Sequence, residues 1–456
     1  MTSGSGWNDR TLVYTGGISP NIPAGVTTGP ATASTPTGQI AVLTAVNILA
    51  RVHSEVVLAI SDPPLLVPSP AGGSTLVEAC LALATAANPK VVVRVTDEMP
   101  AGTLSVGIGP DAGSAFVYAG GARWTARTAS TPVGITPEAS SLLGVGMAVA
   151  LATGVLFRAA IGWPVVRERS VSLWTLSETD EPSGPATCGP VGIGTVWMVG
   201  AGAVGSCLAW WLHFVGVVGT WTVIDGDRAD CTNLNRSLGL FAAEVSLSSG
   251  QATPKAVAAA ALIPGAVAVP KWWNDWSASD PASPDVLIPV ANDFGVRAAI
   301  AAYSHPATIH ATTSRNWTAE LHRHLLDRDD CPACRFPEDA PAFACASASG
   351  TPAARLADEE PLDEKAEPVK DAALPFLSAA AGLLLLAGLL QLQHGQWSTH
   401  QRNHWRIFFD DSSRTLRPSK WPRIQRCTAT ASPSVRRAVH SETRWRTLDP
   451  EGAGRG

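Results

Sequence analysis

The sequence predicts an α/β protein with two doubly wound halves, of which the first is degenerate. One observation is a stretch in which an apolar strand, Val196 to Val199, enters a turn that contains Gly200, Gly202 and Gly205. An apolar helix follows the turn, and a second strand, Thr220 to Ile224, follows the helix. The other observation is an earlier stretch with the same order of turn, apolar helix and apolar strand.

The turn with three glycines is typical of a mononucleotide-binding β-α-β unit. Glycine lets the backbone turn tightly and approach a phosphate, whose charge is met by the N–H groups at the start of the helix. Asp225 ends the second strand, where a carboxylate accepts hydrogen bonds from a ribose. The glycines alone also fit a nicotinamide or flavin enzyme, so the reaction type depends on the residues that follow.

The residues after the second strand are more specific than the glycines. They read DGDRADCTNLNR, and Lys255 begins a later helix. This pattern resembles the superfamily of ubiquitin-activating enzymes and ThiF-type sulfur-carrier adenylyltransferases. The resemblance implies two Rossmann-like adenylation-type halves that use ATP and Mg²⁺. It also implies that Asp225 holds the ribose and that further polar residues line the nucleotide: Asp227, Asn233, Asn235, Arg236 and Lys255.

A further buried strand ends in Asn292 and Asp293. Residues past the carboxyl ends of parallel strands face the ligand crevice, so we expect Asp293 to bind Mg²⁺ on the ATP phosphates. Activation of a carboxylate also needs cations near the leaving pyrophosphate, and Arg236 and Lys255 supply them. The chain departs from the family pattern at three positions near this site, and none of them removes a charge that the chemistry needs.

The first half is predicted to be an inactive adenylation-like domain, because residues 37–62 repeat the turn, helix and strand without the phosphate loop. Ubiquitin-activating enzymes resemble this arrangement, and in the family the partner half delivers an arginine to the γ-phosphate. Arg10 and Arg51 are the weak candidates here. Two unrelated doubly wound sheets are the alternative. The predicted boundaries are 1–169 for the inactive domain, 170–194 for a linker, 195–430 for the active domain with a Cys-containing crossover insertion over 311–371, and 431–456 for a fraying tail.

Smaller elements follow from local patterns. Ser74 is expected to cap its helix. The expected elements are a strand over 11–14, a helix over 74–87, strands over 90–95, 103–108 and 406–410, and long apolar helices over 137–161 and 373–392.

Cys331 and Cys334 form a C-x-x-C in the turn CPAC, which is half of a structural zinc site. In the sulfur-carrier relatives a second C-x-x-C near the C-terminus completes the tetrahedron, whereas this chain has the single Cys427 there. A histidine would complete the site, and the candidates are His322, His324, His394 and His440. A pair of turn cysteines without metal is the alternative.

Cys345 lies in the loop FACASASG, downstream of CPACRFPED. By the resemblance, a cysteine at this place accepts the activated carboxyl group or a sulfur. A thiolate attacks an acyl adenylate near neutral pH and gives a thioester that can be passed on. The alternatives are a third zinc ligand or an ordinary loop cysteine. Cysteines on apolar helices, such as Cys80 and Cys207, are expected to behave as small hydrophobic residues.

Composition limits the class of protein. Hydrophobic residues make up 46 % and charged residues 16 % of the chain, which indicates a globular protein. The net charge of −5 gives no reason to expect nucleic acid or an anionic membrane as partner. Eight scattered cysteines and an N-terminus without a signal-peptide pattern favour the cytoplasm. Two apolar segments, 141–163 and 372–390, are expected to be buried helices rather than membrane spans.

Together these features predict that the protein adenylates the C-terminal glycine of a small ubiquitin-like β-grasp protein, captures it on Cys345 as a thioester, and hands it to a conjugating enzyme. One alternative ends in sulfur transfer, with a persulfide on Cys345. Another is a non-catalytic relative that binds a leader peptide, although binding alone does not require Arg236, Lys255 and Asp293. A homodimer stays possible, although an inactive half within the chain would make a second copy unnecessary as the source of the γ-phosphate arginine.

Overall fold

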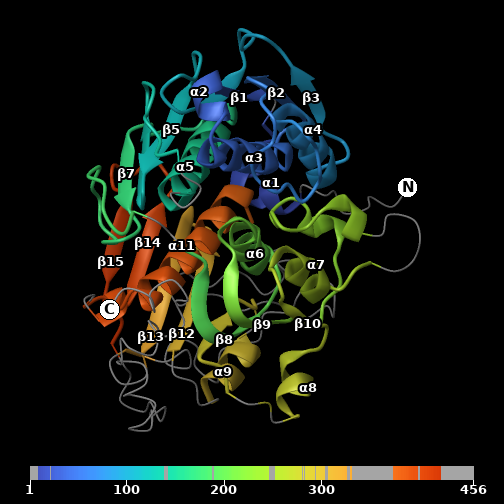
Figure 1. Cartoon of the computed structure of the whole chain (residues 1–456), viewed down its shortest axis with the longest axis vertical. Helices are drawn as coiled ribbons and strands as arrows, with labels where there is room; N and C mark the ends of the chain where they lie inside the picture. The colour runs from blue at the N-terminus through green and yellow to red at the C-terminus, as the bar shows by residue number, and fades with distance from the viewer. Residues whose placement is uncertain are drawn as a thin grey trace.

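The computed structural model describes residues 9–20, 22–137, 142–186, 189–245, 252–279, 281, 283–292, 294–302, 307–325, 329–330, 373–398 and 401–422. Within these ranges the chain forms two mixed sheets, each with helices packed against it (Figure 1). Both sheets have parallel strands at their centre, and two Rossmann-like halves are therefore confirmed as the fold class.

The first sheet has the strand order β3-β2-β1-β4-β5-β6-β7. The strands β3 to β5 along this order are parallel, and β6 and β7 extend the sheet in antiparallel fashion. Successive strands are added on one side of β1 as far as β3 and on its other side from β4 onward. The boundary between β1 and β4 is therefore the topological switch point, which is where a doubly wound sheet binds ligands. The bounds are β1 Ala24–Thr28, β2 Glu55–Ile60, β3 Val92–Val95, β4 Leu104–Ile108, β5 Val117–Ala122, β6 Thr125–Ala129 and β7 Arg169–Ser172.

The second sheet repeats this plan with the order β10-β9-β8-β11-β12-β13-β14-β15. The strands from β10 to β12 are parallel, and those from β12 to β15 pair in antiparallel fashion. The switch point lies between β8 and β11. The bounds are β8 Val191–Val199, β9 Val217–Ile224, β10 Val267–Val269, β11 Val286–Pro289, β12 Ala307–Ser314, β13 Thr318–Leu325, β14 His404–Phe408 and β15 Leu416–Ser419.

The helices connect the parallel strands and cover the sheets (Figure 1). Side-chain oxygens cap two helices of the first half, since Thr35 accepts from the N–H of Gly38 and Thr75 from that of Glu78. The bounds are α1 Asp9–Thr15, α2 Pro30–Ala33, α3 Pro36–Ala50, α4 Leu76–Ala87, α5 Leu142–Ala160, α6 Ala203–Val215, α7 Lys255–Leu262, α8 Trp273–Ser277, α9 Phe294–Ala302 and α11 Pro375–Gln393.

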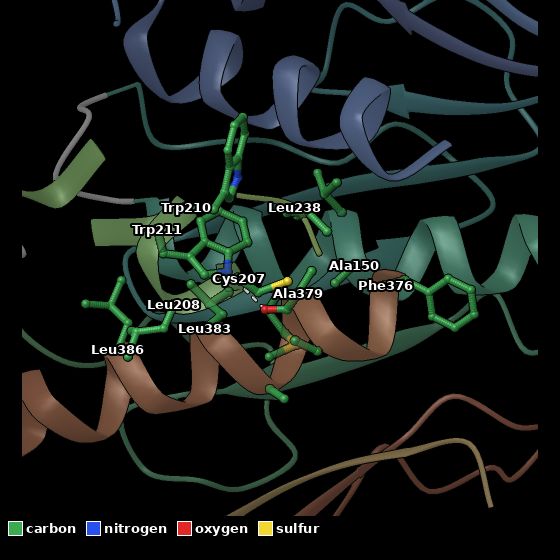
Figure 2. Packing of buried hydrophobic residues seen from close by; sticks show 14 of the residues in the cluster. Ala150, Cys207, Leu208, Trp210, Trp211, Leu238, Phe376, Ala379, Leu383 and Leu386 are labelled. Carbon is green, nitrogen blue, oxygen red and sulfur yellow. Dashed lines mark hydrogen bonds between the residues drawn. The ribbon is translucent and has the colours of Figure 1, made fainter. Parts of the chain in front are cut away.

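One hydrophobic core joins the two halves, and α5, α6 and α11 form its centre. Two tryptophans of α6 point in different directions there (Figure 2). The Trp210 indole N–H donates to Thr44 Oγ1 of α3 over 3.2 Å, whereas that of Trp211 donates to the carbonyl oxygen of Ala379 in α11 over 2.9 Å. On α5, Gly146 lies against the Trp211 ring, where a larger residue would collide. The two halves are therefore packed as one body.

Two helices are long and apolar enough to cross a membrane by length and composition. They are α5, with a mean hydropathy of 1.8, and α11, with 1.9. Both lie inside the fold, since 94 % of the apolar window of α5 and 100 % of that of α11 are buried. This burial agrees with the expectation of core helices.

Several expected bounds differ from the structure. Residues 11–14 form the helix α1 and not a strand, because Tyr14 packs edge-on to the Trp317 ring and Thr11 contacts the second half. Thr75 rather than Ser74 caps α4. The sheets also extend beyond the expected domain limits: β7 continues to Ser172, β8 begins at Val191, and β12 and β13 occupy part of the expected insertion. The sequence of β13 is rich in polar residues, but three of its alternate positions, Ala319, Leu321 and Leu325, are apolar, as is typical of a strand.

Candidate nucleotide site

The glycine turn leaves the N-terminus of α6 open. Gly200 follows β8 with a φ of 105°, in the left-handed region that favours glycine. A side chain on Gly205 would clash with the carbonyl oxygen of Gly200, so both glycines are needed for the turn to pack against the helix. A Cβ on Gly202, the N-cap of α6, would meet nothing within 4 Å. The open N-terminus can therefore receive an anion.

Asp225, Asp227 and Lys255 form a connected group beside this turn. The Asp225 carboxylate accepts from the N–H of Ala201 over 2.6 Å and from the N–H of Asp227 over 2.8 Å. The Lys255 ammonium, on the first residue of α7, lies 2.8 Å from Asp227 Oδ2. Burial raises the pKa of the Asp225 carboxyl, while the charge of Lys255 and the two amide donors act in the opposite direction. The group joins the glycine turn, the end of β9 and the start of α7.

Asn233, Asn235 and Arg236 lie together on the segment that begins with a 3₁₀ turn, Cys231–Asn233, and all three are buried. Asn233 Oδ1 accepts from the N–H of Asp230 over 3.0 Å. The Arg236 guanidinium donates to the carbonyl oxygen of Thr232 and to Asn235 Oδ1. These bonds, together with the Cys207 thiol of α6 that donates to the carbonyl oxygen of Arg236, give the segment a fixed shape.

The first half holds this segment in place. Asn235 Nδ2 donates to Thr11 Oγ1 of α1 over 3.1 Å. At the C-cap of α3, the fully buried Arg51 guanidinium donates to the carbonyl oxygens of Leu234, Leu238 and Leu240. Burial lowers the pKa of Arg51 to about 9.

Arg51, one of the two weak candidates for the γ-phosphate arginine, instead uses its donors on backbone carbonyls inside the core. Arg10 stays a prediction. It precedes Thr11 on α1, and Thr11 is the residue that contacts Asn235.

Two residues near the site were missed at the sequence level. The Trp272 indole lies over Gly226, next to Asp225 in the chain, and the residue is 52 % exposed. Its sequence signal was the run KWWNDW, in which Trp273 and Trp276 are instead packed with Trp197 of β8. The buried Arg297 of α9 donates to the carbonyl oxygen of Ala291, just beyond β11, over 2.9 Å, and the spacing of charged residues gave no sign of this contact.

The remaining predicted site residues lie outside the described residues: Asp293, Cys331, Cys334, Cys345 and Cys427. Their roles stay predictions. Two cysteines within the described ranges are buried, as expected, and burial raises the pKa of the Cys207 thiol to about 12 and also raises that of Cys80. Thiols of this kind are unreactive.

Comparison with known families identifies both parts of the chain. Residues 193–393 match the ThiF family, and residues 24–174 match the BilD N-terminal domain. The chain therefore contains a ThiF family domain. A BilD N-terminal domain precedes it.

Individual proteins resemble parts of the chain. The protein y4jF of Sinorhizobium fredii is 28 % identical over 240 residues, which are 50 % of this chain and 44 % of y4jF. E. coli MccB with ATP is 15 % identical over 52 % of this chain and 66 % of MccB, with a TM-score of 0.38. The microcin C7 biosynthetic enzyme MccB in complex with N-formylated MccA is 15 % identical over 52 % of this chain and 68 % of that one, with a TM-score of 0.37. Likenesses at this level carry no argument about activity.

Proposed function

We propose that this protein is an ATP-dependent adenylyltransferase that activates the C-terminal glycine of a small ubiquitin-like β-grasp protein. The activated glycine then forms a thioester with Cys345 and passes to a conjugating enzyme in the cytoplasm. The ThiF family domain supports adenylation as the reaction type. The ubiquitin-like partner and the thioester rest on the resemblance of the site residues and on Cys345.

The connected group of Asp225, Asp227 and Lys255 is the observation that carries this proposal. A nicotinamide enzyme needs an acid for the ribose, but it does not need a buried lysine paired with a second acid at the start of the next helix. A lysine in this place brings positive charge to the phosphates. The carboxylate of Asp227 keeps that ammonium in place until the phosphates share it.

Each residue has a separate task in the proposed reaction. Asp225 accepts hydrogen bonds from the ribose, the N–H groups at the start of α6 meet a phosphate, and Lys255 and Arg236 balance the charge of the leaving pyrophosphate. ATP supplies the adenylyl group, and Asp293 would hold Mg²⁺, which would reduce the charge of the phosphates. Catalysis of this kind depends on positioning and electrostatics, so fixed side chains matter more than a strong base.

ATP–pyrophosphate exchange tests the adenylation. The full-length protein should exchange labelled pyrophosphate into ATP only when a β-grasp protein that ends in glycine is present. Asp293→Ala should abolish the exchange, whereas the matched control Asp275→Ala, on the exposed side of α8, should leave it unchanged. Exchange that persists in Asp293→Ala contradicts the metal role. Exchange with a short leader peptide but with no β-grasp protein contradicts the substrate.

The fate of the activated glycine is tested separately. Cys345→Ala should keep the exchange and lose a covalent adduct that thiols release. An adduct that persists in this variant places the nucleophile elsewhere. Mass spectrometry of the partner separates the two sulfur chemistries, because sulfur transfer converts its terminal carboxylate to a thiocarboxylate. Structural zinc on Cys331, Cys334 and Cys427 is also part of the proposal.

A further inference from the structure

Three buried histidines meet on one face of the second sheet, away from the nucleotide site. His322 and His324 are two residues apart on β13, so their side chains leave the strand on the same side. His310 of β12 is the direct partner of His322 in the antiparallel register. The three residues are 0 to 5 % exposed, and one ring nitrogen from each lies within 4.8 Å of those of the other two.

The segment 329–330 contacts one ring nitrogen of each of the two β13 histidines. His322 Nε2 lies 3.0 Å from the Asp330 carboxylate, and His324 Nδ1 lies 3.0 Å from the carbonyl oxygen of Asp330. Asn403 Nδ2 donates to the same carboxylate over 2.8 Å, and Asp330 is itself only 1 % exposed. Metal-binding histidines almost always donate their second N–H to a carboxylate or a backbone carbonyl, which fixes the ring and the tautomer.

The remaining nitrogens are close enough to share an ion. His324 Nε2 lies 3.1 Å from His310 Nδ1. Two nitrogens bound tetrahedrally to zinc at about 2.0–2.1 Å would be separated by roughly 3.3 Å. Neutral imidazoles suit zinc and related divalent metals, whereas they bind Mg²⁺ and Ca²⁺ poorly.

We propose that His310, His322 and His324 form a binding site for a divalent transition metal, most suitably zinc. The ion would join β12 to β13 and hold both strands to the segment 329–330. This ligand set consists of described residues and requires none of the three cysteines named above. The site lies on the face of the sheet opposite α11, because the alternate residues Ile309 and Leu321 pack against Gly388 of that helix.

Metal content of the full-length protein tests the proposal. Protein purified without chelator should contain zinc that His310→Asn and His324→Asn each remove, whereas His53→Asn, at a buried histidine of the first half, should leave it in place. The double variant Cys331→Ser/Cys334→Ser should also keep it. Zinc that stays after His310→Asn or His324→Asn in the Cys331→Ser/Cys334→Ser background overturns the proposal, because the cysteine site is then no longer available, and so does zinc that leaves only when the cysteines are replaced.

A second measurement avoids any dependence on how the histidine variants fold. Cobalt(II) added to the metal-free Cys331→Ser/Cys334→Ser protein should give the visible d–d absorption of a tetrahedral nitrogen site without a thiolate charge-transfer band. Asp330→Asn should weaken cobalt binding at least about tenfold, because that carboxylate orients His322. A protein of native secondary structure that takes up neither cobalt nor zinc overturns the proposal, and the three rings are then only a hydrogen-bonded cluster. None of these readouts depends on adenylation.

Discussion

The two halves of the molecule have the same strand order, but they differ in the turn between the central strand and the next long helix. In each half a glycine follows the central strand, Gly29 after β1 and Gly200 after β8. In each half the third residue of the next long helix is also a glycine whose side chain would clash with a backbone carbonyl, Gly38 in α3 and Gly205 in α6. The first half therefore keeps more of the glycine turn than its sequence suggested.

The difference lies between those glycines. The first half has four more residues there than the second, and they form the short helix α2. The Asp111 carboxylate, which follows β4, accepts from the N–H groups of Ala31 and Thr32 at the start of α2 and from the Thr32 hydroxyl. An internal carboxylate thus satisfies the donors that would otherwise face an anion.

The first half also lacks counterparts of Asp225 and Lys255. β2 and β9 end at Ile60 and Ile224, and the next residue is Ser61 in the first half and Asp225 in the second. The helix after that strand begins with Leu76 in α4 and with Lys255 in α7. The two halves therefore share the sheet and the glycines that shape the turn, whereas the acid and the lysine beside that turn are present only in the second half.

The largest expected difference between the halves concerns Lys255. Lys255→Ala should lower ATP–pyrophosphate exchange by roughly 100-fold or more, because it removes a cation from the phosphate site. Lys90→Ala, at an exposed lysine beyond α4 in the first half, should change the rate by less than about twofold. Equal loss in both variants would point to a general effect of charge and not to a site in the second half.

Acid should destabilise the two halves in separate pH ranges. Burial lowers the pKa of His53 in the first half to about 4, so its contribution to stability is complete above the usual 6.5 and declines as the pH falls toward 4. Burial alone would raise the pKa of Glu320 in the second half, but the hydrogen bond and charge of His404, with Arg406, lower it to about 2. Its contribution is complete above the usual 4.5 and is lost as the pH falls to about 2.

Each contribution amounts to about 3 kcal/mol at most. Urea unfolding at a series of pH values measures both. Glu320→Gln should flatten the plot of unfolding free energy against pH only below about pH 4.5. His53→Asn should flatten it only between about pH 4 and 6.5. A single transition that neither variant alters would show that other groups control acid stability.

The glycines at the third helix position should have equal structural effects and unequal functional ones. Gly38→Ala and Gly205→Ala should each lower the free energy of unfolding by about 1–3 kcal/mol, because the added methyl group meets a backbone carbonyl. Only Gly205→Ala should also raise the Michaelis constant for ATP in the exchange assay. A similar rise for Gly38→Ala would indicate that the first half takes part in nucleotide binding.

The smallest effect is expected at Asp111. Asp111→Ala should cost about 1–2 kcal/mol of stability, since it removes the acceptor for the start of α2. Exchange activity should not change. Thermal unfolding followed by circular dichroism measures the loss, and titration with ATP in a Lys255→Ala background checks whether the vacated position binds nucleotide. Binding in that double variant would show that Asp111 alone blocks an otherwise intact site.

The sequence by itself determined the order of the elements around the glycine turn, because turn glycines and strand-end acids have local backbone causes. It also predicted Asp225, Asn235 and Arg236 as residues of a nucleotide site, and that role stays a prediction. It also indicated that α5 and α11 are buried, since a helix that is apolar on every side needs cover all round.

Only the tertiary structure decided how distant residues meet. Arg51 was only a weak candidate for the γ-phosphate arginine, and its contact with carbonyls of the 234–240 segment depends on how α3 packs on α6. Asp111 blocks the first half because β4 lies beside β1. The three histidines gather because β12 and β13 pair in one register, and a shift of one residue would turn His310 to the other face. Such contacts depend on packing between segments far apart in the chain, which local patterns do not encode.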